Sequence, residues 1–394
     1  MLIEIMLALF LGILVGTLTG LIPGIHINLI GVFLISLSAS LFISINPNYL
    51  LVFIVSAAIT HTFVDFIPSI FLGCPDTDTE LSILPGHELL KQGQGYEAVI
   101  LTCYGSLAAS IILILLAFPS VLLLSKIYGF VLNFLPYLLL AIIGFLIYLE
   151  KKRATAFFVL LLTGILGLIV LNLPVKEPLL PLLTGLFGSS MLIGSIKNKI
   201  QIPKQQIQNP KIKLFKPLLG ATIASPLCCF LPGLGSGQAA IIGNVISRTD
   251  RKGFLVLLGA TNTLVMGFSF ISLYAITKAR TGAAIVIQEL MGNISLKILV
   301  LILLVILISA VISFFITIAL TKFFSKKIEK INYTILSSII LGFLCILIFS
   351  LSGFFGLIVF IVSTLTGIYC ISLGVKRTNM MGCLLIPTII LYLF

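Results

Sequence analysis

The sequence is poor in charged side chains. Asp, Glu, Lys and Arg make up only 9% of its 394 residues, whereas 59% are hydrophobic and the mean hydropathy is +1.26. Soluble domains carry about 25% charged residues, which excludes a soluble fold of this size. Apolar runs of about 20 residues recur without the alternation of a membrane β-barrel. The sequence therefore predicts an all-α, multi-pass protein of the cell membrane.

Several signatures of soluble proteins are also missing. The seven cysteines form no CxxC pair, so we expect neither a disulfide nor a metal cluster, and no cofactor. A nucleotide-binding P-loop, HExxH and GxSxG do not occur, so the chain is not itself an ATPase and shows no catalytic motif. The N-terminus lacks Lys and Arg and carries Glu4, unlike a removable signal peptide. The net charge of +12 comes mostly from short loops, which indicates membrane orientation and not nucleic-acid binding.

A basic polar linker, residues 196–216, divides the chain into two halves. Two short motifs recur in the same order on either side of it. Ile22-Pro23-Gly24 matches Leu231-Pro232-Gly233, and THTFV at 60–64 matches TNTLV at 261–265. We therefore expect a first membrane repeat at 1–195, a cytoplasmic linker, and a second membrane repeat at 217–394.

The clusters of Lys and Arg predict the relative orientation of the two repeats. If all of them are cytoplasmic, each repeat consists of one hairpin and five spans. Five is odd, so the repeats should be inverted, an arrangement in which secondary transporters bind substrate near the midplane. The predicted hairpins are 3–45 and 217–247, and the predicted spans are 49–73, 97–118, 130–149, 154–172, 180–194, 253–275, 293–321, 333–352, 353–373 and 380–394.

Proline and glycine interrupt both hairpins. Irregular backbone at membrane depth is tolerated only where it faces protein or a water-filled cavity. Helix N-termini after such breaks attract anions, and glycine lets backbone N–H groups approach a ligand. The alternative is that the glycines serve close helix packing. The predicted substrate-binding residues at the tips are Pro23, Gly24, His26 and Asn28, and Pro232, Gly233, Gly235, Ser236, Gly237 and Gln238.

Polar residues also occur inside two predicted spans. His61 and Asp65 are four positions apart and share one helix face. Ionisable residues within a membrane usually line a pathway, so we predict that this pair carries a coupling ion. A structural hydrogen bond between the two is the alternative, and two ligands are too few for a metal site. Thr62, Asn262 and Thr263 would bind substrate beside them.

Two further polar stretches lie between predicted spans. Lys278 and Arg280 form the only basic cluster that the orientation places outside the cell. They could meet an anionic substrate or belong to a solvated loop, and we keep them as substrate-binding candidates. Within the polar stretch 73–98, Asp76, Asp78 and Glu80 are interpreted as a capped, solvated helix start, and Lys91 and Gly93 as a helix end.

These motifs together resemble the large permease subunit of the tripartite tricarboxylate transporters. Gly20 to Gly24 is similar to a Gly-x-x-Pro-Gly motif of that family, and Pro232 to Gly235 to its second Pro-Gly-x-Gly segment. The stretch PGHELLKQGQGYEA at 85–98 has the frame of a third family motif, although it begins Pro-Gly-His-Glu where the family has Asp-Gly-Tyr-Pro. The resemblance covers residues 1–290. It implies a permease that works with a small membrane subunit and an extracytoplasmic binding protein.

The residues and the resemblance together favour a secondary transporter for an organic anion such as a carboxylate, coupled to H⁺ or Na⁺. Two alternatives stay open. One is translocation of a phosphorylated lipid carrier, since broken hairpins also suit lipid phosphates. The other is an intramembrane enzyme that uses His61 and Asp65 with a third group such as His26 or His87. Because no catalytic motif is evident, we predict a permease and not an enzyme.

Overall fold

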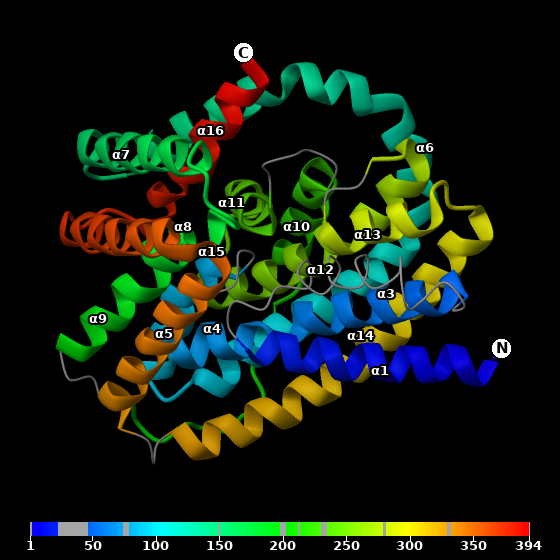
Figure 1. Cartoon of the computed structure of the whole chain (residues 1–394), viewed down its shortest axis with the longest axis horizontal. Helices are drawn as coiled ribbons and strands as arrows, with labels where there is room; N and C mark the ends of the chain where they lie inside the picture. Colours follow the sequence, from blue (N-terminus) through cyan, green and yellow to red (C-terminus); the bar gives the residue numbers. More distant parts are fainter. Residues whose placement is uncertain are drawn as a thin grey trace.

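Helices make up the regular structure of the computed structural model (Figure 1). The structure describes residues 2–22, 46–73, 79–148, 150–197, 202–211, 213–229, 235–278, 281–328 and 332–393. Before the linker, the helices are α1 (Leu2–Leu21), α3 (Pro47–Val64), α4 (Phe66–Leu72), η1 (Glu80–Ser82), α5 (Ile83–Lys91), α6 (Gly95–Tyr148), α7 (Arg153–Leu171), α8 (Leu179–Leu183), η2 (Thr184–Ser189) and α9 (Ser190–Lys197). After the linker, they are α10 (Phe215–Cys228), α11 (Ser236–Ser247), α12 (Arg251–Ile276), α13 (Gly282–Met291), α14 (Leu296–Ile328), α15 (Tyr333–Ser372), η3 (Arg377–Met381) and α16 (Gly382–Leu393).

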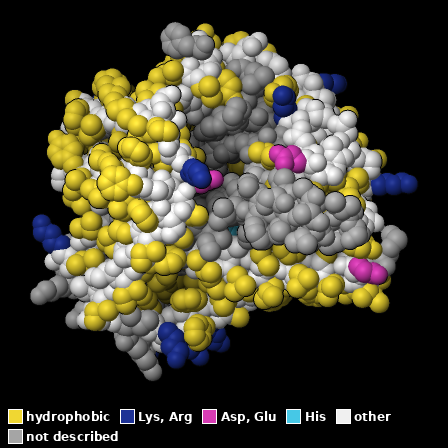
Figure 2. Space-filling model, viewed as in Figure 1, with side chains coloured by type: hydrophobic (Ala, Val, Ile, Leu, Met, Phe, Trp, Pro, Cys, Tyr) yellow, Lys and Arg dark blue, Asp and Glu magenta, His cyan; other side chains and the backbone are white. Residues whose placement is uncertain are grey.

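Seven helical segments in the described part of the chain are long and apolar enough to cross a membrane. They are α1, α3 together with α4, residues Gly95–Phe130 of α6, α7, α12, α14 and most of α15. Hydrophobic side chains cover much of the face shown in Figure 2, and charged side chains are sparse there. Such a surface suits contact with lipid tails. The prediction of an all-α polytopic membrane protein is therefore confirmed.

Some predicted spans differ from the helices observed. The spans 97–118 and 130–149 belong to one continuous helix, α6. The two spans predicted at 333–352 and 353–373 are both helical, and they are divided at Gly353 (φ 69°, ψ −166°), which interrupts the helical backbone within α15 as predicted. Residues 119–129, which lie between the spans 97–118 and 130–149, are mostly apolar, so the sequence contains no polar loop that would end the helix there. Shorter apolar helices occupy the remaining two predicted spans, 180–194 and 380–394.

The α3–α4 segment and α12 lie at the centre of the molecule. In their most apolar windows, 89% and 94% of the residues are buried, compared with 50% or less in the other candidate spans. The two central segments are thus enclosed by other helices. Polar side chains on them face protein and not lipid, which is the condition under which a membrane protein tolerates such groups.

Glycines let neighbouring helices approach this centre closely. A Cβ atom on Gly259 of α12 would meet the carbonyl oxygen of Thr102 on α6 at 2.1 Å. A Cβ atom on Gly16 of α1 would meet the carbonyl oxygen of Ala57 on α3 at 2.3 Å. Small residues commonly mediate contacts between membrane helices because they let the backbones touch. These two glycines therefore serve helix packing.

The second predicted hairpin contains two short helices, α10 and α11, that pack against each other. With 14 and 12 residues, they are about 21 and 18 Å long, too short for a hydrocarbon core of about 30 Å. The first predicted hairpin differs, because its first arm, α1, has the length of a full span. The predicted tip residues Pro23, Gly24, His26, Asn28, Pro232 and Gly233 lie outside the described residues.

Candidate functional site

Asp65 lies where α3 ends and α4 begins. Its backbone N–H donates to the carbonyl oxygen of His61 at 3.0 Å, so the helical path continues past the junction. Pro68 has no N–H to donate to the carbonyl oxygen of Val64, which weakens the helix at this point. The hydroxyl of Ser69 donates instead to the carbonyl oxygen of Asp65 at 2.8 Å. His61 and Asp65 are both buried, each with 3% of its surface exposed.

The two motifs that match between the halves meet in space. Oγ1 of Thr62 lies 3.3 Å from Oγ1 of Thr263. Nδ2 of Asn262 donates to Oδ2 of Asp65 at 2.9 Å, and it also lies 3.5 Å from the carbonyl oxygen of Thr62. All four side chains are buried. The structure therefore joins four residues that the sequence singled out separately, and we call them, with His61, the central polar cluster.

The cluster lies near mid-length on two antiparallel segments. Thr62 is the sixteenth residue of the 26-residue segment Pro47–Leu72, and Thr263 is the thirteenth residue of α12, which also has 26 residues. The chain that follows α4 returns to the beginning of α12, where Glu88 pairs with Arg251 at 2.7 Å. The end of one central segment thus lies at the start of the other. This places the polar contacts far from both ends.

Hydroxyl groups on two flanking helices extend the cluster. Oγ1 of Thr19 on α1 lies 3.1 Å from Nδ1 of His61. Oγ of Ser313 on α14 donates to Oγ1 of Thr60 at 2.8 Å. Sequence reasoning missed these partners, since single Ser and Thr residues occur throughout the predicted spans and carry little signal. Among the residues in these contacts, Thr60 was noted from the sequence, because it belongs to the repeated motif at 60–64.

The N-terminus of α11 holds the described part of the second hairpin tip. The backbone N–H of Gly235 donates to Oε1 of Gln238 at 2.7 Å. Ser236, Gly237 and Gln238 are buried, and Nε2 of Gln238 has no hydrogen-bond partner among the described residues. The first N–H groups of a helix have no partner within the helix and carry partial positive charge. This end of α11 can therefore accept an anion.

The predicted outer basic cluster lies apart from the central one. Lys278 is exposed and follows α12, and its carbonyl oxygen accepts a hydrogen bond from Oγ of Ser272 at 2.8 Å. Ser272 lies nine residues beyond Thr263, which is about 14 Å along the helix at 1.5 Å per residue. Lys278 is therefore not among the residues that the structure brings together, and Arg280 lies outside the described residues.

The predicted helix start at Asp76 and Asp78 lies outside the described residues, and much of the described part of 79–98 is buried. His87 on α5 is buried, and burial together with the nearby Lys91 charge lowers the pKa of this imidazole to about 3. The neutral ring therefore persists at physiological pH. His87 lies against the C-cap of α4, where a Cβ atom on Gly73 would be 3.2 Å from Nε2. The helix end near Lys91 agrees with the prediction, because α5 stops at that residue.

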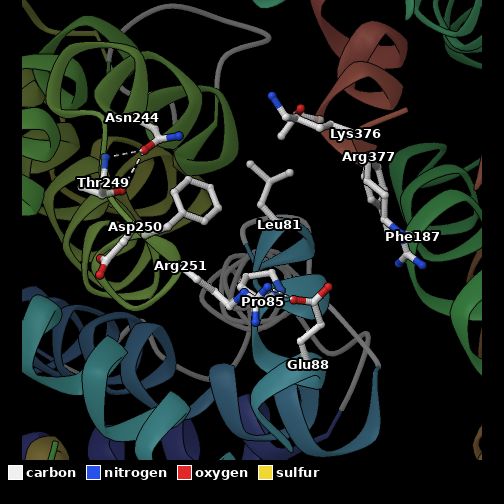
Figure 3. Close-up of a pocket in the computed structure, with 12 residues that line it drawn as sticks. Leu81, Pro85, Glu88, Phe187, Asn244, Thr249, Asp250, Arg251, Lys376 and Arg377 are labelled. Atoms are coloured by element: carbon white, nitrogen blue, oxygen red, sulfur yellow. Dashed lines mark hydrogen bonds and ion pairs between the residues drawn. The ribbon is translucent and has the colours of Figure 1, made fainter. Parts of the chain in front are cut away.

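A cavity of about 380 Å³, which the sequence did not reveal, lies near α5 (Figure 3). Residues of both halves line it, namely Leu81, Pro85, Glu88 and Phe187 of the first half, and Asn244, Thr249, Asp250, Arg251, Phe254, Lys376, Arg377 and Thr378 of the second. Arg251 extends from α12 to Glu88 on α5 across this space. The cavity is thus lined by residues from both halves of the chain. It lies beside the ion pair of Glu88 with Arg251, which joins the two halves.

Comparison with known proteins agrees with this architecture. Residues 6–382 match the tripartite tricarboxylate transporter TctA family, so the match extends well beyond the 1–290 expected from motifs. An uncharacterized protein of Methanocaldococcus jannaschii is 34% identical over 400 residues, covering 98% of this chain and 99% of the relative. No solved structure matches the chain. The chain is a multi-pass membrane permease and belongs to the tripartite tricarboxylate transporter TctA family.

Proposed function

We propose that this protein is an ion-coupled secondary permease for small organic anions, with tricarboxylates and related carboxylates as substrates. The observation that carries the proposal is the buried contact between Thr62 and Thr263, which joins two repeated motifs at mid-length of antiparallel helices. Equivalent residues meet each other where a two-fold axis passes through a structure. The contact therefore supports two inverted repeats, 1–195 and 217–394, joined by the linker 196–216.

The anion would bind between the central polar cluster and the hairpin tips. Support comes from the N-terminus of α11, where the buried Nε2 of Gln238 and the first N–H groups of the helix offer donors and no carboxylate. α11 packs against α12, the helix that carries Asn262 and Thr263. In this proposal the first tip, with His26 and Asn28, completes the site from the other repeat.

Asp65 would carry the coupling ion, H⁺ or Na⁺. A charged carboxylate at membrane depth is costly, and Asp65 is buried there, where its Oδ2 accepts a hydrogen bond from the amide of Asn262. Taking up a cation would remove this cost. His61, which lies in the preceding turn and contacts Thr19, would adjust the affinity of Asp65 through its own charge.

The family name describes a three-component transporter. We propose that this chain, as the large permease, receives its anion from an extracytoplasmic binding protein and works beside a small membrane subunit. The exposed end of α12 with Lys278, together with Arg280, would meet the anion on that side. Exposed cations steer anions toward an entrance through long-range attraction.

Counterflow in proteoliposomes tests the substrate class. Purified protein is reconstituted with an excess of unlabelled citrate or succinate inside, and entry of the labelled acid is measured. We expect counterflow in the native protein and a loss of at least about tenfold in Asn262→Ala, since a hydrogen bond to an ionised group is worth about 1.5–3 kcal/mol.

Asn293→Ala is the matched control, because Asn293 is exposed in the loop before α14. It should leave counterflow unchanged. Native rates in Asn262→Ala would show that the central polar cluster does not contact the substrate path.

A further inference from the structure

The cavity in Figure 3 combines apolar walls with a surplus of cations. Leu81, Pro85, Phe187 and Phe254 contribute the apolar walls. Three cationic side chains line the same space, namely Arg251, Lys376 and Arg377, against two acidic ones, Glu88 and Asp250. Its volume of about 380 Å³ is within the range of small-molecule sites.

Both acidic side chains are already engaged. Oδ1 of Asp250 accepts the backbone N–H of Gly253 at 2.8 Å and thereby caps α12. Oε2 of Glu88 pairs with Nη2 of Arg251 at 2.7 Å. That ion pair is only half-buried, with 40% and 48% of the two side chains exposed, and pairs of this kind are weak. A ligand carboxylate can therefore replace Glu88 on Arg251.

Arg377 forms no ion pair with a carboxylate among the described residues. Its Nη1 contacts the sulfur atom of Met191 at 3.6 Å. Burial lowers the pKa of Arg377, and the charge of Glu88 partly opposes this effect. The pKa of Lys91 is lowered by burial and then by Arg377. Among the described residues that line the cavity, cations thus outnumber carboxylates.

The position of Arg377 is fixed by the segment before it. Oε1 of Glu150 accepts the backbone N–H of Lys376 at 3.2 Å and Nδ2 of Asn379 at 3.1 Å. These two bonds hold the beginning of η3. In Figure 3, Arg377 lies on the Phe187 side of the cavity and Arg251 on the opposite side, with Glu88 between them. Two guanidinium groups from different elements thus line one cavity.

We propose that this cavity is a second anion site, which binds a small organic dicarboxylate or tricarboxylate between Arg251 and Arg377. One carboxylate replaces Glu88 on Arg251, and another pairs with Arg377. Guanidinium groups bind carboxylates in a planar, two-bond geometry. The apolar walls favour an anion with a carbon skeleton over inorganic phosphate. The site lies at the charged end of α12 and is separate from the central polar cluster.

Binding at this site would alter the contact between the two halves. Glu88–Arg251 and Glu97–Lys252 are ion pairs that join residues after α4 to the start of α12. A bound anion releases the first pair and leaves the second, which has an N–O distance of 2.6 Å. Occupancy of the cavity therefore loosens one of these two links.

Ligand-dependent thermal stability measures this binding. Most of the described cysteines are buried, so a thiol-reactive dye that gains access to them on unfolding reports the transition. Citrate, succinate and phosphate are titrated at constant ionic strength in an Asn262→Ala background, which removes the proposed contribution of the central cluster. We expect citrate to stabilise the protein and phosphate to have little effect.

Arg377→Gln in that background should weaken citrate binding at least about tenfold, since a charge-assisted pair is lost. Arg153→Gln is the matched control, because Arg153 is exposed and lies outside the cavity lining. It should change the affinity by less than about twofold.

Glu88→Gln provides a test that misfolding cannot imitate. It removes the side chain that competes for Arg251, so we expect citrate to bind about threefold more tightly. Unchanged citrate affinity in Arg377→Gln, or equal stabilisation by citrate and phosphate, would overturn the proposal. Neither result bears on the central cluster, whose test is counterflow.

Discussion

The two central segments, α3–α4 and α12, share a motif but differ in its chemistry. Both carry a Thr-x-Thr sequence at mid-length, and Thr62 and Thr263 touch. In the first segment, His61 lies between the threonines and Asp65 follows them. The matching places on α12 hold Asn262 and Met266. The scaffold is thus similar on both sides, and the titratable groups are confined to one. In the proposed function, the coupling ion therefore has one candidate carboxylate in this pair of segments, and not two.

The helices that follow these two segments differ in the charge of their contacts. After α4, Glu88 and Glu97 form ion pairs with the start of α12. After α12, the contacts that the structure describes for α13 and its cap are neutral, such as that of Nε2 of Gln288 with the carbonyl oxygen of Thr277 at 3.2 Å. Ion pairs at a surface weaken with salt, but neutral hydrogen bonds respond little. A change in ionic strength should therefore affect the contacts at the start of α12 more than those at its end.

Removing the carboxylate from the first segment should have the largest effect. In Asp65→Asn, uptake driven by an imposed ion gradient should fall to the level of empty liposomes, while exchange of labelled for unlabelled citrate continues. The amide keeps the shape and a hydrogen-bond acceptor for Asn262 but does not carry a cation. Proteoliposomes with separate H⁺ and Na⁺ gradients provide the measurement.

Met266→Leu is the control for that experiment, because Met266 holds the matching position on α12 and the exchange conserves volume. It should transport normally. Undiminished gradient-driven uptake in Asp65→Asn would mean that Asp65 is only a structural partner within the cluster, and that the asymmetry has no role in coupling.

A second change tests whether α12 depends on close packing. In Gly259→Ala the new methyl group would lie 2.1 Å from the Thr102 carbonyl oxygen, which cannot move without shifting α6. We expect a destabilisation of about 3 kcal/mol, seen as a lower unfolding temperature at a fixed scan rate. Gly129→Ala, where a Cβ atom meets nothing within 4 Å, should unfold like the native protein. If both variants unfold alike, α6 does not pack on α12 as closely as described.

The smallest effect concerns the contact between the two threonines. Oγ1 of Thr62 donates to the carbonyl oxygen of Ile59 at 2.8 Å, so its contact with Thr263 uses the proton of Thr263. Thr62→Val leaves that proton without an acceptor and should destabilise the protein by about 1–2 kcal/mol. Thr263→Val removes only a donor and should cost about 0.5–1 kcal/mol.

A double-mutant cycle in detergent, read as unfolding temperatures, measures this coupling. Additive effects of the two substitutions would show that the hydroxyls do not interact. Equal single effects would contradict the assigned direction of the hydrogen bond.

Sequence reasoning found the main members of the central polar cluster, because ionisable and amide side chains are rare in apolar segments. His61, Asp65 and Asn262 stand out there for this reason. It did not find Thr19 or Ser313, since hydroxyl groups satisfy themselves within any helix and are common in spans. The predicted division between 97–118 and 130–149 differs from the single helix α6, because the mostly apolar residues between these spans give no sign of whether a helix stops or continues.

The sequence by itself determined the class of the protein and the elements it uses. Long apolar runs must form helices in a membrane, because lipid offers no partner for a free backbone N–H or carbonyl group. Only the tertiary structure decided that Asp65 meets Asn262 across 197 positions, and that Arg251 and Arg377 line one cavity. Such contacts depend on which helix faces pack together and at what depth, and those are set by glycine contacts and side-chain shapes distributed over the whole chain.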